Sequence, residues 1–219
     1  ALGVNISLSA IEVARCVDEI GIGFMFAPNH HSAMKYAAPV RRELGVRTVF
    51  NLLGPMTNPA GARRQVMGVF ARDLVPKLIQ VLKQLDAKHV MIVHGADGLD
   101  EISVSGETAI AELKDGAIRE YTVSPEDFGL TRVSVGALRV SNKEESASFV
   151  RAVLNNEPGP ACDVVCLNAG AAIYVSGIAA NVREGASVAR ELVAQGAAHR
   201  KLEQLVELSN SLNAQSSKS

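Results

Sequence analysis

Hydrophobic residues recur at helical spacing from the tenth position of the chain onward. Ser9 and Glu12 have the spacing of a capping box, and the apolar residues after them fall on one face of a predicted helix that Gly21 ends. Residues 22–27 are a short, wholly apolar run, which is typical of a strand buried on both faces. Because Pro28 breaks this run, we expect the histidines that follow to lie at the carboxyl end of a strand.

A βαβ pattern occupies the middle of the chain. A strand is predicted over residues 65–70, a helix with Asp73 at its N-cap follows, and a second strand is predicted over residues 88–94. This order favours a parallel pair joined by a right-handed crossover. Residues 102–123 show short alternating runs separated by turn signals, which predict an antiparallel hairpin or sheet edge.

Helical patterns fill most of the rest of the chain. The predicted helices cover residues 143–154, 162–175, 182–194 and 197–212. An Ala/Gly run at residues 169–172 allows one of them to pack very closely against a neighbour. We therefore predict an α/β fold with a mostly parallel central sheet, flanking helices and a short antiparallel edge. One domain is predicted over residues 1–212, followed by a disordered polar tail over residues 213–219.

Composition narrows the classes of partner. The chain has 219 residues, of which 47% are hydrophobic and 21% charged, as expected of a globular protein with one substantial core. A net charge of -1 argues against a broad nucleic-acid or anionic-membrane surface. No apolar run approaches the ~20 residues that span a bilayer. Cys16, Cys162 and Cys166 lack the spacing of zinc ligands and are predicted to be buried, which fits a reducing cytoplasm.

Candidate chemistry gathers between residues 24 and 70. His30 and His31 are adjacent, but adjacent side chains diverge on most backbones, so hydrogen bonding by one ring is favoured over metal binding by both. Arg41 lies in a predicted helical segment. The loop over residues 50–59 is more apolar than a solvent-exposed loop without a binding role would be. We interpret this stretch as one wall of a small-molecule site with Arg41 as the anchor for an anion. A solvated basic face is the alternative.

A glycine-rich acidic loop, residues 95–101, follows the second strand of the βαβ pattern. Asp97, Asp100 and Glu101 lie close together on it, and such carboxylates repel one another unless a cation or water separates them. Hard oxygen ligands of this kind suit magnesium that is held jointly with a phosphorylated substrate. A plain acidic turn is the alternative.

Taken together, these motifs resemble one known family. The chain is similar to the carboxyl-terminal two-thirds of the anthranilate phosphoribosyltransferases, which have the nucleoside phosphorylase/phosphoribosyltransferase fold. The resemblance is most specific in HSAMK at residues 31–35, VRRELGVRT at 40–48, NLLGPMTNPA at 51–60 and GLDE at 98–101.

The resemblance implies a role for four residues in the stretch between residues 24 and 70. Arg41 corresponds to the arginine that contacts the carboxylate of anthranilate. His31, Gly54 and Pro55 correspond to residues that line the path of this aromatic substrate. The implied reaction joins the anthranilate amine to C1 of the ribose of phosphoribosyl pyrophosphate and expels pyrophosphate, a step of tryptophan biosynthesis. It needs no covalent catalytic residue.

The resemblance also implies a cofactor and an assembly. Asp100 and Glu101 correspond to the acidic pair that holds Mg²⁺ on the pyrophosphate of the donor. Members of the family are cytoplasmic homodimers without nucleic-acid or membrane partners, and the same is expected here.

Part of the family pattern has no equivalent in this sequence. The family's Gly-Thr-Gly-Gly-Asp phosphate loop, its Lys-His-Gly-Asn segment and its helical amino-terminal domain are missing. Bare backbone N–H groups of such a loop are what approach pyrophosphate closely. We therefore expect a truncated catalytic domain that is inactive alone. A pyrimidine-nucleoside phosphorylase and a non-catalytic, nucleic-acid-binding relative of the same fold are the alternatives.

Overall fold

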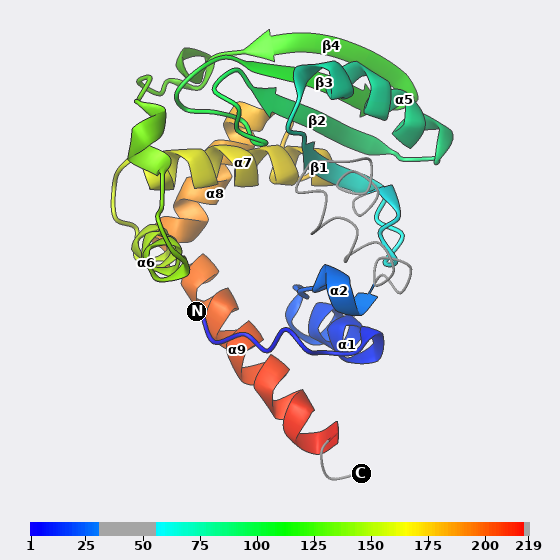
Figure 1. Ribbon diagram of the computed structural model, residues 1–219, viewed down its shortest axis with the longest axis vertical. Helices are drawn as coiled ribbons and strands as arrows, with labels where there is room; N and C mark the ends of the chain where they lie inside the picture. The colour runs from blue at the N-terminus through cyan, green and yellow to red at the C-terminus, as the bar shows by residue number, and fades with distance from the viewer. Residues whose placement is uncertain (31–55, 217–219) are drawn as a thin grey trace, which may run out of the picture. The chain divides into compact units, whose positions relative to one another are not determined.

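The computed structural model describes residues 1–30 and 56–216, with side chains as far as residue 212 (Figure 1). The chain divides into two compact units: one contains the residues before 62 and after 196, and the other contains residues 62–196. The two units are defined by contacts within each of them. The prediction of a single domain over residues 1–212 therefore stays a prediction.

The unit formed by the chain ends is helical where it is described. Its helices are α1 (Ala10–Ile20), α2 (Ala27–His30) and α9 (Ala197–Ser216). Val13 and Cys16 of α1 share a buried apolar cluster with Leu205 and Leu212 of α9. Helix α9 continues to Ser216, past its predicted end at residue 212. The predicted disorder stays a prediction for residues 217–219, which lie outside the described part.

Helix α1 begins and ends as its sequence predicts. The Ser9 hydroxyl accepts from the Glu12 N–H at 3.4 Å, and the Glu12 carboxylate accepts from the Ser9 N–H at 2.7 Å. This reciprocal pair satisfies two backbone donors that the first turn leaves open. At the other end, Gly21 adopts the left-handed conformation with φ 76° and donates to the Val17 carbonyl.

The predicted strand over residues 22–27 is not present. Residues 22–26 have no regular secondary structure, and Pro28 belongs to α2, so His30 ends a short helix instead of a strand. The side chain of Phe24 is 48% exposed. A buried strand needs neighbouring strands for its backbone N–H and C=O groups, and the described residues of this unit supply none. Apolar composition alone was therefore an insufficient signal.

The unit over residues 62–196 is built on a four-stranded sheet. Its strands, in spatial order, are β1 (Arg64–Gly68), β2 (His89–Gly95), β3 (Thr108–Lys114) and β4 (Ala117–Val123). Strands β1 and β2 are parallel, whereas the pairs β2–β3 and β3–β4 are antiparallel. The α/β class and the parallel βαβ unit are confirmed, and the antiparallel part of the described sheet is larger than predicted. Asp115 and Gly116, both at positive φ, make the two-residue turn of the predicted hairpin.

The connection between β1 and β2 covers one face of the sheet. It consists of a 3-10 turn, η1 (Arg72–Leu74), and helix α5 (Val75–Gln84). The prediction that Asp73 caps this helix is wrong, because η1 places Asp73 inside a helical turn and makes Leu74 the N-cap. The Asp73 carboxylate instead accepts from Lys77 Nζ at 2.7 Å. Leu78, Ile79 and Leu82 form the buried face of α5.

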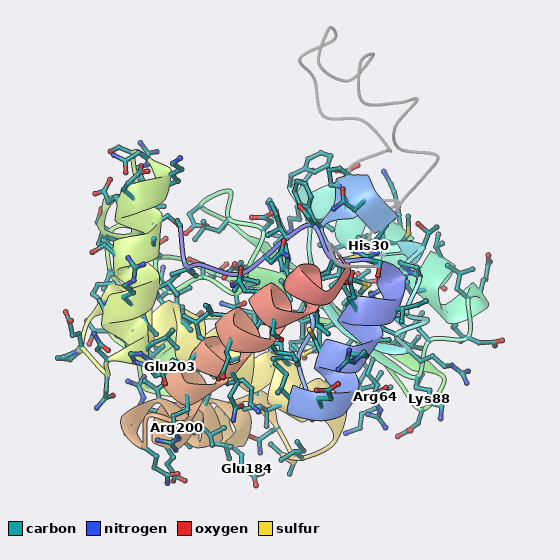
Figure 2. The ribbon with its side chains drawn as sticks, turned by 90° about the horizontal axis from the view of Figure 1, so that it is seen from below. His30, Arg64, Lys88, Glu184, Arg200 and Glu203 are labelled. Carbon is teal, nitrogen blue, oxygen red and sulfur yellow. The ribbon has the colours of Figure 1, made fainter. Side chains whose placement is uncertain are left out.

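Helix α7 covers the opposite face of the sheet (Figure 1). The remaining elements of this unit are η2 (Pro125–Phe128), η3 (Val135–Leu138), α6 (Lys143–Leu154), α7 (Pro160–Ser176) and α8 (Val182–Ala194). Met91 and Val93 of β2 pack in one core with Leu167 and Ala171 of α7. Arg64, labelled in Figure 2, donates to the Val175 carbonyl at 2.6 Å and ties β1 to the end of α7.

Glycines set the close contact between α7 and α8. A Cβ added to Gly170 would collide with the backbone of Ala186, and one added to Gly185 would collide with the Gly170 carbonyl. Only residues without a side chain allow the two backbones to approach so closely. The packing role predicted for the Ala/Gly run is confirmed.

Two predictions from composition are also tested by the fold. Cys16, Cys162 and Cys166 are buried and free, as predicted. Burial and the neighbouring Cys162 raise the pKa of Cys166 to about 11, so its reactive thiolate is scarce at neutral pH. Among the described helices, none combines the length and apolar character needed to cross a bilayer.

A buried carboxylate lies in the core between the sheet and α7. Glu112 of β3 is 3% exposed and accepts from Tyr174 Oη at 2.6 Å and Tyr121 Oη at 3.0 Å. His89 Nε2 lies 3.0 Å from the same carboxylate. Lys114 Nζ donates to Tyr174 Oη at 3.3 Å and extends the network. Strands β2, β3 and β4 and helix α7 are thus joined through one buried anion.

Candidate functional site

Two of the six predicted site residues belong to the described part of the chain. Asp100 and Glu101 lie on the loop that leaves the carboxyl end of β2, as the βαβ pattern predicts. The other four lie outside the described residues: His31, Arg41, Gly54 and Pro55. Their predicted roles stay predictions.

The acidic loop begins with a tight, hydrogen-bonded turn. The Gly95 N–H donates to the Leu99 carbonyl at 2.8 Å, and the Gly98 N–H donates to the Gly95 carbonyl at 2.9 Å. Gly98 has φ 90°, a conformation that residues with a Cβ rarely adopt. The turn therefore brings the chain back over the end of β2 directly before Asp100.

The carboxylate of Asp97 stabilises this loop by accepting hydrogen bonds from nearby residues. Its Oδ1 accepts from the Leu99 N–H at 3.1 Å, and its Oδ2 accepts from the hydroxyls of Ser103, at 2.6 Å, and Ser105. Burial by itself raises the pKa of Asp97, but these hydrogen bonds outweigh it and hold the pKa below its ordinary value. Both oxygens of Asp97 already accept hydrogen bonds. Asp97 therefore differs from Asp100 and Glu101, with which its position in the sequence had grouped it as a candidate metal ligand.

Asp100 and Glu101 are both exposed. Neither carboxylate forms a hydrogen bond or ion pair with any residue that the structure describes. Glu101 borders a cleft of about 290 Å³ whose other walls are mostly apolar, including Leu99, Phe149 and Val164. Desolvation and the neighbouring Asp100 charge raise the pKa of Glu101. Two adjacent carboxylates are thus presented without a counter-ion in the described structure.

Asn168 of α7 holds the other end of the acidic pair, and sequence reasoning missed it. Its Oδ1 accepts from the Ile102 N–H at 2.9 Å, and its Nδ2 donates to the Ile102 carbonyl at 2.9 Å. Nδ2 also donates to the Val164 carbonyl at 2.9 Å. The available signal was a polar residue within a largely apolar helix, and this signal does not indicate which group the residue bonds.

Gly68, the last residue of β1, lies beneath Asp100. A Cβ added to Gly68 would overlap the Asp100 carbonyl, and a backbone group cannot move aside as a flexible side chain can. The absence of a side chain at Gly68 is therefore what allows the acidic loop to rest on the end of the sheet.

Replacing Gly68 with Ala is expected to lower the free energy of unfolding of the chain by about 1–3 kcal/mol, the usual cost of overpacking. Urea unfolding monitored by circular dichroism measures this change. Gly106 is the matched control, since a Cβ there would meet no atom within 4 Å and its φ is not positive. Equal stability of the Gly68→Ala and Gly106→Ala variants would contradict the steric argument.

The donor set of the loop fits a shared magnesium ion. Mg²⁺ prefers about six oxygen ligands and usually keeps several waters. In the described ranges, 1–30 and 56–216, no group of three or more His, Cys, Asp and Glu side chains is placed to hold a metal. Asp100 and Glu101 offer oxygen ligands from only two side chains, so they fit an ion that completes its shell with water and a substrate phosphate.

His30 is the described member of the histidine pair. Its Nε2 is buried and has no hydrogen-bond partner among the described residues. Its neighbour His31 lies outside them, so the prediction that one ring of the pair forms a hydrogen bond stays a prediction.

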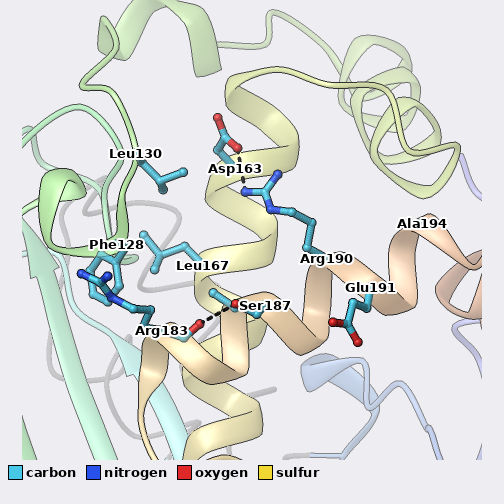
Figure 3. A pocket seen from close by; sticks show the side chains of 10 residues that line it. Phe128, Leu130, Asp163, Leu167, Arg183, Ser187, Arg190, Glu191 and Ala194 are labelled. Atoms are coloured by element: carbon cyan, nitrogen blue, oxygen red, sulfur yellow. Dashed lines mark hydrogen bonds and ion pairs between the residues drawn. The ribbon is translucent and has the colours of Figure 1, made fainter.

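A second cleft, of about 340 Å³, lies between α7, α8 and the segment after η2 (Figure 3). Phe128, Leu130 and Leu167 form its apolar part. Arg190 pairs with Asp163 at 2.9 Å, and Arg183 donates to the Asp127 carbonyl. Both guanidinium groups are thus engaged, and the cleft shares no lining residue with the acidic loop.

Comparison with known proteins assigns the family. Residues 1–199 match the model of the glycosyl transferase family, a/b domain. The anthranilate phosphoribosyltransferase of Laribacter hongkongensis is 61% identical over 98% of this chain, and that of Methylobacillus flagellatus is 60% identical over 95%. The chain spans 63% and 61% of the lengths of these two relatives.

Solved structures agree with the sequence relatives. The anthranilate phosphoribosyltransferase of Thermus thermophilus superposes with a TM-score of 0.88 at 41% identity, covering 95% of this chain and 62% of that one. The Saccharomyces cerevisiae enzyme in complex with PRPP and Mg gives a TM-score of 0.86 at 25% identity, covering 96% and 61%. The resemblance predicted from the motifs is confirmed, and the chain belongs to the glycosyl transferase family with this a/b domain.

Proposed function

We propose that the protein transfers the phosphoribosyl group of phosphoribosyl pyrophosphate to the amine of anthranilate and releases pyrophosphate. The observation that carries this proposal is the 61% identity, over 98% of the chain, to an anthranilate phosphoribosyltransferase. The acidic pair on the β2 loop, which has no ion-pair partner among the described residues, supports it, because the proposed donor needs a site for its metal-bound pyrophosphate. In this proposal Arg41, His31, Gly54 and Pro55 bind anthranilate.

In this proposal Asp100 and Glu101 hold Mg²⁺ at the donor. When bound, the ion supplies neutralisation of the negative charge that develops on pyrophosphate as it leaves. The chain's own contribution is positional: the turn at Gly95–Leu99, the hydrogen bonds of Asp97 and the contact at Gly68 hold the backbone that carries the two carboxylates. No covalent intermediate with a protein residue is proposed.

Replacing Arg41 with Ala is expected to raise the KM for anthranilate by about 10- to 100-fold, since a charge-assisted hydrogen bond contributes about 1.5–3 kcal/mol. The KM for phosphoribosyl pyrophosphate should change far less. Steady-state kinetics on the full-length gene product, with each substrate varied in turn, measure both constants. Equal effects on the two constants would mean that Arg41 is structural.

A direct assay tests the proposed activity. The full-length gene product is mixed with anthranilate, phosphoribosyl pyrophosphate and Mg²⁺, and the loss of anthranilate fluorescence is followed together with pyrophosphate release. Stoichiometric loss and release are expected. Thymidine with inorganic phosphate is the parallel substrate pair for a pyrimidine-nucleoside phosphorylase. Turnover of that pair alone would overturn the proposal.

We also propose that the full-length gene product is a homodimer, as the family resemblance implies. Sedimentation equilibrium over a range of concentrations tests this assembly. A single species with the mass of one chain, at concentrations where the protein is active, would contradict it.

A further inference from the structure

The acidic loop is attached to the core at a point directly after Glu101. Ile102 is fully buried and lies in the same apolar cluster as Leu167 and Ala171 of α7. Asn168, between those two α7 residues, hydrogen-bonds both the N–H and the C=O of Ile102 at 2.9 Å. A planar amide that pairs with both backbone groups of one residue fixes the position of that residue and the direction of the chain through it.

The orientation of the Asn168 amide follows from its partners. The Ile102 N–H requires an acceptor, which is Oδ1, and the two carbonyls of Ile102 and Val164 require donors, which are the two hydrogens on Nδ2. Both donors and the oxygen are therefore engaged. No other amino acid with this branching at Cγ offers the combination: Asp lacks the donors, and Leu lacks both functions.

From this geometry we infer that Asn168 is the positioning residue of the divalent-cation site formed by Asp100 and Glu101. The inference rests on the proposed function for the assignment of the metal. Asn168 touches neither the cation nor the substrate, and it acts through the backbone of Ile102. Together with Asp97, which holds Leu99 on the other side, it anchors the acidic pair at both ends. Preorganised ligands spare the cation the cost of ordering the loop on binding.

The test measures cation binding apart from catalysis. Mn²⁺ replaces Mg²⁺, inorganic pyrophosphate supplies the phosphate oxygens, and free Mn²⁺ is followed by electron paramagnetic resonance with the full-length gene product. Asn168→Leu keeps the branching at Cγ but removes both hydrogen-bond functions, and it should raise the Kd for Mn²⁺ by about 10- to 100-fold, as loss of a partner that orients metal ligands does. In kinetics, the KM for the Mg²⁺-bound donor should rise while the KM for anthranilate stays within about twofold, because Asn168 acts on the cation site alone.

Tyr174→Phe is the matched control on the same helix. It removes a 2.6 Å hydrogen bond to Glu112 near the end of α7, away from the acidic loop, and it should leave the Kd for Mn²⁺ within about twofold of the wild-type value. If Asn168→Leu does not fold, Asn168→Asp is the substitute. The introduced carboxylate has no N–H to donate to the Ile102 carbonyl, so Asn168→Asp should raise the Kd in the same direction.

Several outcomes decide the inference. It is overturned if folded Asn168 variants bind Mn²⁺ as tightly as the wild type, or if Tyr174→Phe weakens binding equally, since the effect would then belong to α7 as a whole. Wild-type protein that catalyses phosphoribosyl transfer without binding Mn²⁺ would overturn the inference and leave the activity standing. Wild-type protein that binds Mn²⁺ through Asn168-dependent geometry but does not catalyse transfer would support the inference and overturn the proposed function.

Discussion

Replacing Asp100 with Asn is expected to lower kcat/KM for the proposed phosphoribosyl transfer by about 100-fold or more in the full-length gene product. The substitution keeps the size of the side chain but removes one of only two carboxylates that the loop presents to a cation. Loss of a preorganised group that stabilises developing charge commonly costs about 10²–10³ in rate. The Mg²⁺ concentration needed for half-maximal activity should rise, because a neutral amide oxygen binds Mg²⁺ more weakly than a carboxylate does.

Stability should hardly change in the Asp100→Asn variant. The Asp100 carboxylate has no hydrogen bond or ion pair within the described structure, and substitutions at such surface positions usually change the free energy of unfolding by less than about 0.5 kcal/mol. Glu107→Gln is the matched control: it removes one negative charge from an exposed residue at the other end of the same connection between β2 and β3. An unchanged Mg²⁺ titration for Asp100→Asn, or an equal shift for Glu107→Gln, would argue against a metal-binding role for Asp100.

Elements with a strong local signal were predicted correctly from the sequence. The capping box of Ser9 and Glu12 and the turn at Asp115–Gly116 depend on residues three or fewer positions apart, so their geometry is determined by nearby chain. The parallel pair of β1 and β2 follows from the strand–helix–strand order, which restricts how the chain can return to the sheet.

The errors arose where distant or competing contacts decide the structure. Residues 22–27 have the composition of a buried strand, but a strand forms only where partners supply its hydrogen bonds. Asp73 is a good N-cap residue by type, yet a 3-10 turn shifts the start of α5 past it. In both cases local propensity was overruled by the surrounding backbone.

The residues of the candidate site also fall into those that the local sequence indicates and those that depend on distant contacts. The acidic pair Asp100–Glu101 was found from its carboxylates and from the family resemblance. Asp97 differs from this pair because its carboxylate accepts a hydrogen bond from the Ser103 hydroxyl. Spacing along the chain does not show which carboxylate that hydroxyl contacts. Asn168 lies 66 positions from Ile102, so its pairing with that backbone follows only from the packing of α7 against the loop.

Replacing Glu112 with Leu is expected to lower the free energy of unfolding of the chain by about 3–5 kcal/mol at pH 7. The Leu side chain accepts no hydrogen bond, so Tyr121, Tyr174 and His89 would each lose their shared acceptor inside the core. A buried donor left without a partner costs about 1–3 kcal/mol, and several such costs in one network are not fully additive. Urea unfolding measures the loss from the lower transition midpoint. The slope of the unfolding free energy against urea concentration should stay unchanged.

The difference between the wild type and Glu112→Leu should depend on pH in a defined direction. Burial by itself raises the pKa of Glu112, but hydrogen bonds from Tyr174, His89 and Tyr121 outweigh it and hold the pKa below its ordinary value. A carboxyl group with a lowered folded-state pKa stabilises the fold fully above its unfolded pKa of about 4.3, and this contribution is lost as the pH falls through the folded value. Tyr174, whose pKa burial and Glu112 raise to about 12, stays protonated throughout that range. The difference should therefore be constant near neutrality and shrink below about pH 4.

Removing the donors as well as the acceptor separates two explanations for the loss. If the cost of Glu112→Leu comes from donors left unsatisfied, adding Tyr121→Phe and Tyr174→Phe should recover part of the stability, because apolar groups of similar shape then fill the site without unmet hydrogen bonds. Tyr121→Phe alone should cost about 1 kcal/mol, the usual contribution of one hydrogen bond. A triple variant less stable than Glu112→Leu would mean that the hydroxyls contribute through packing or through the Lys114 contact to Tyr174, and that the carboxylate is not the organising group of this network.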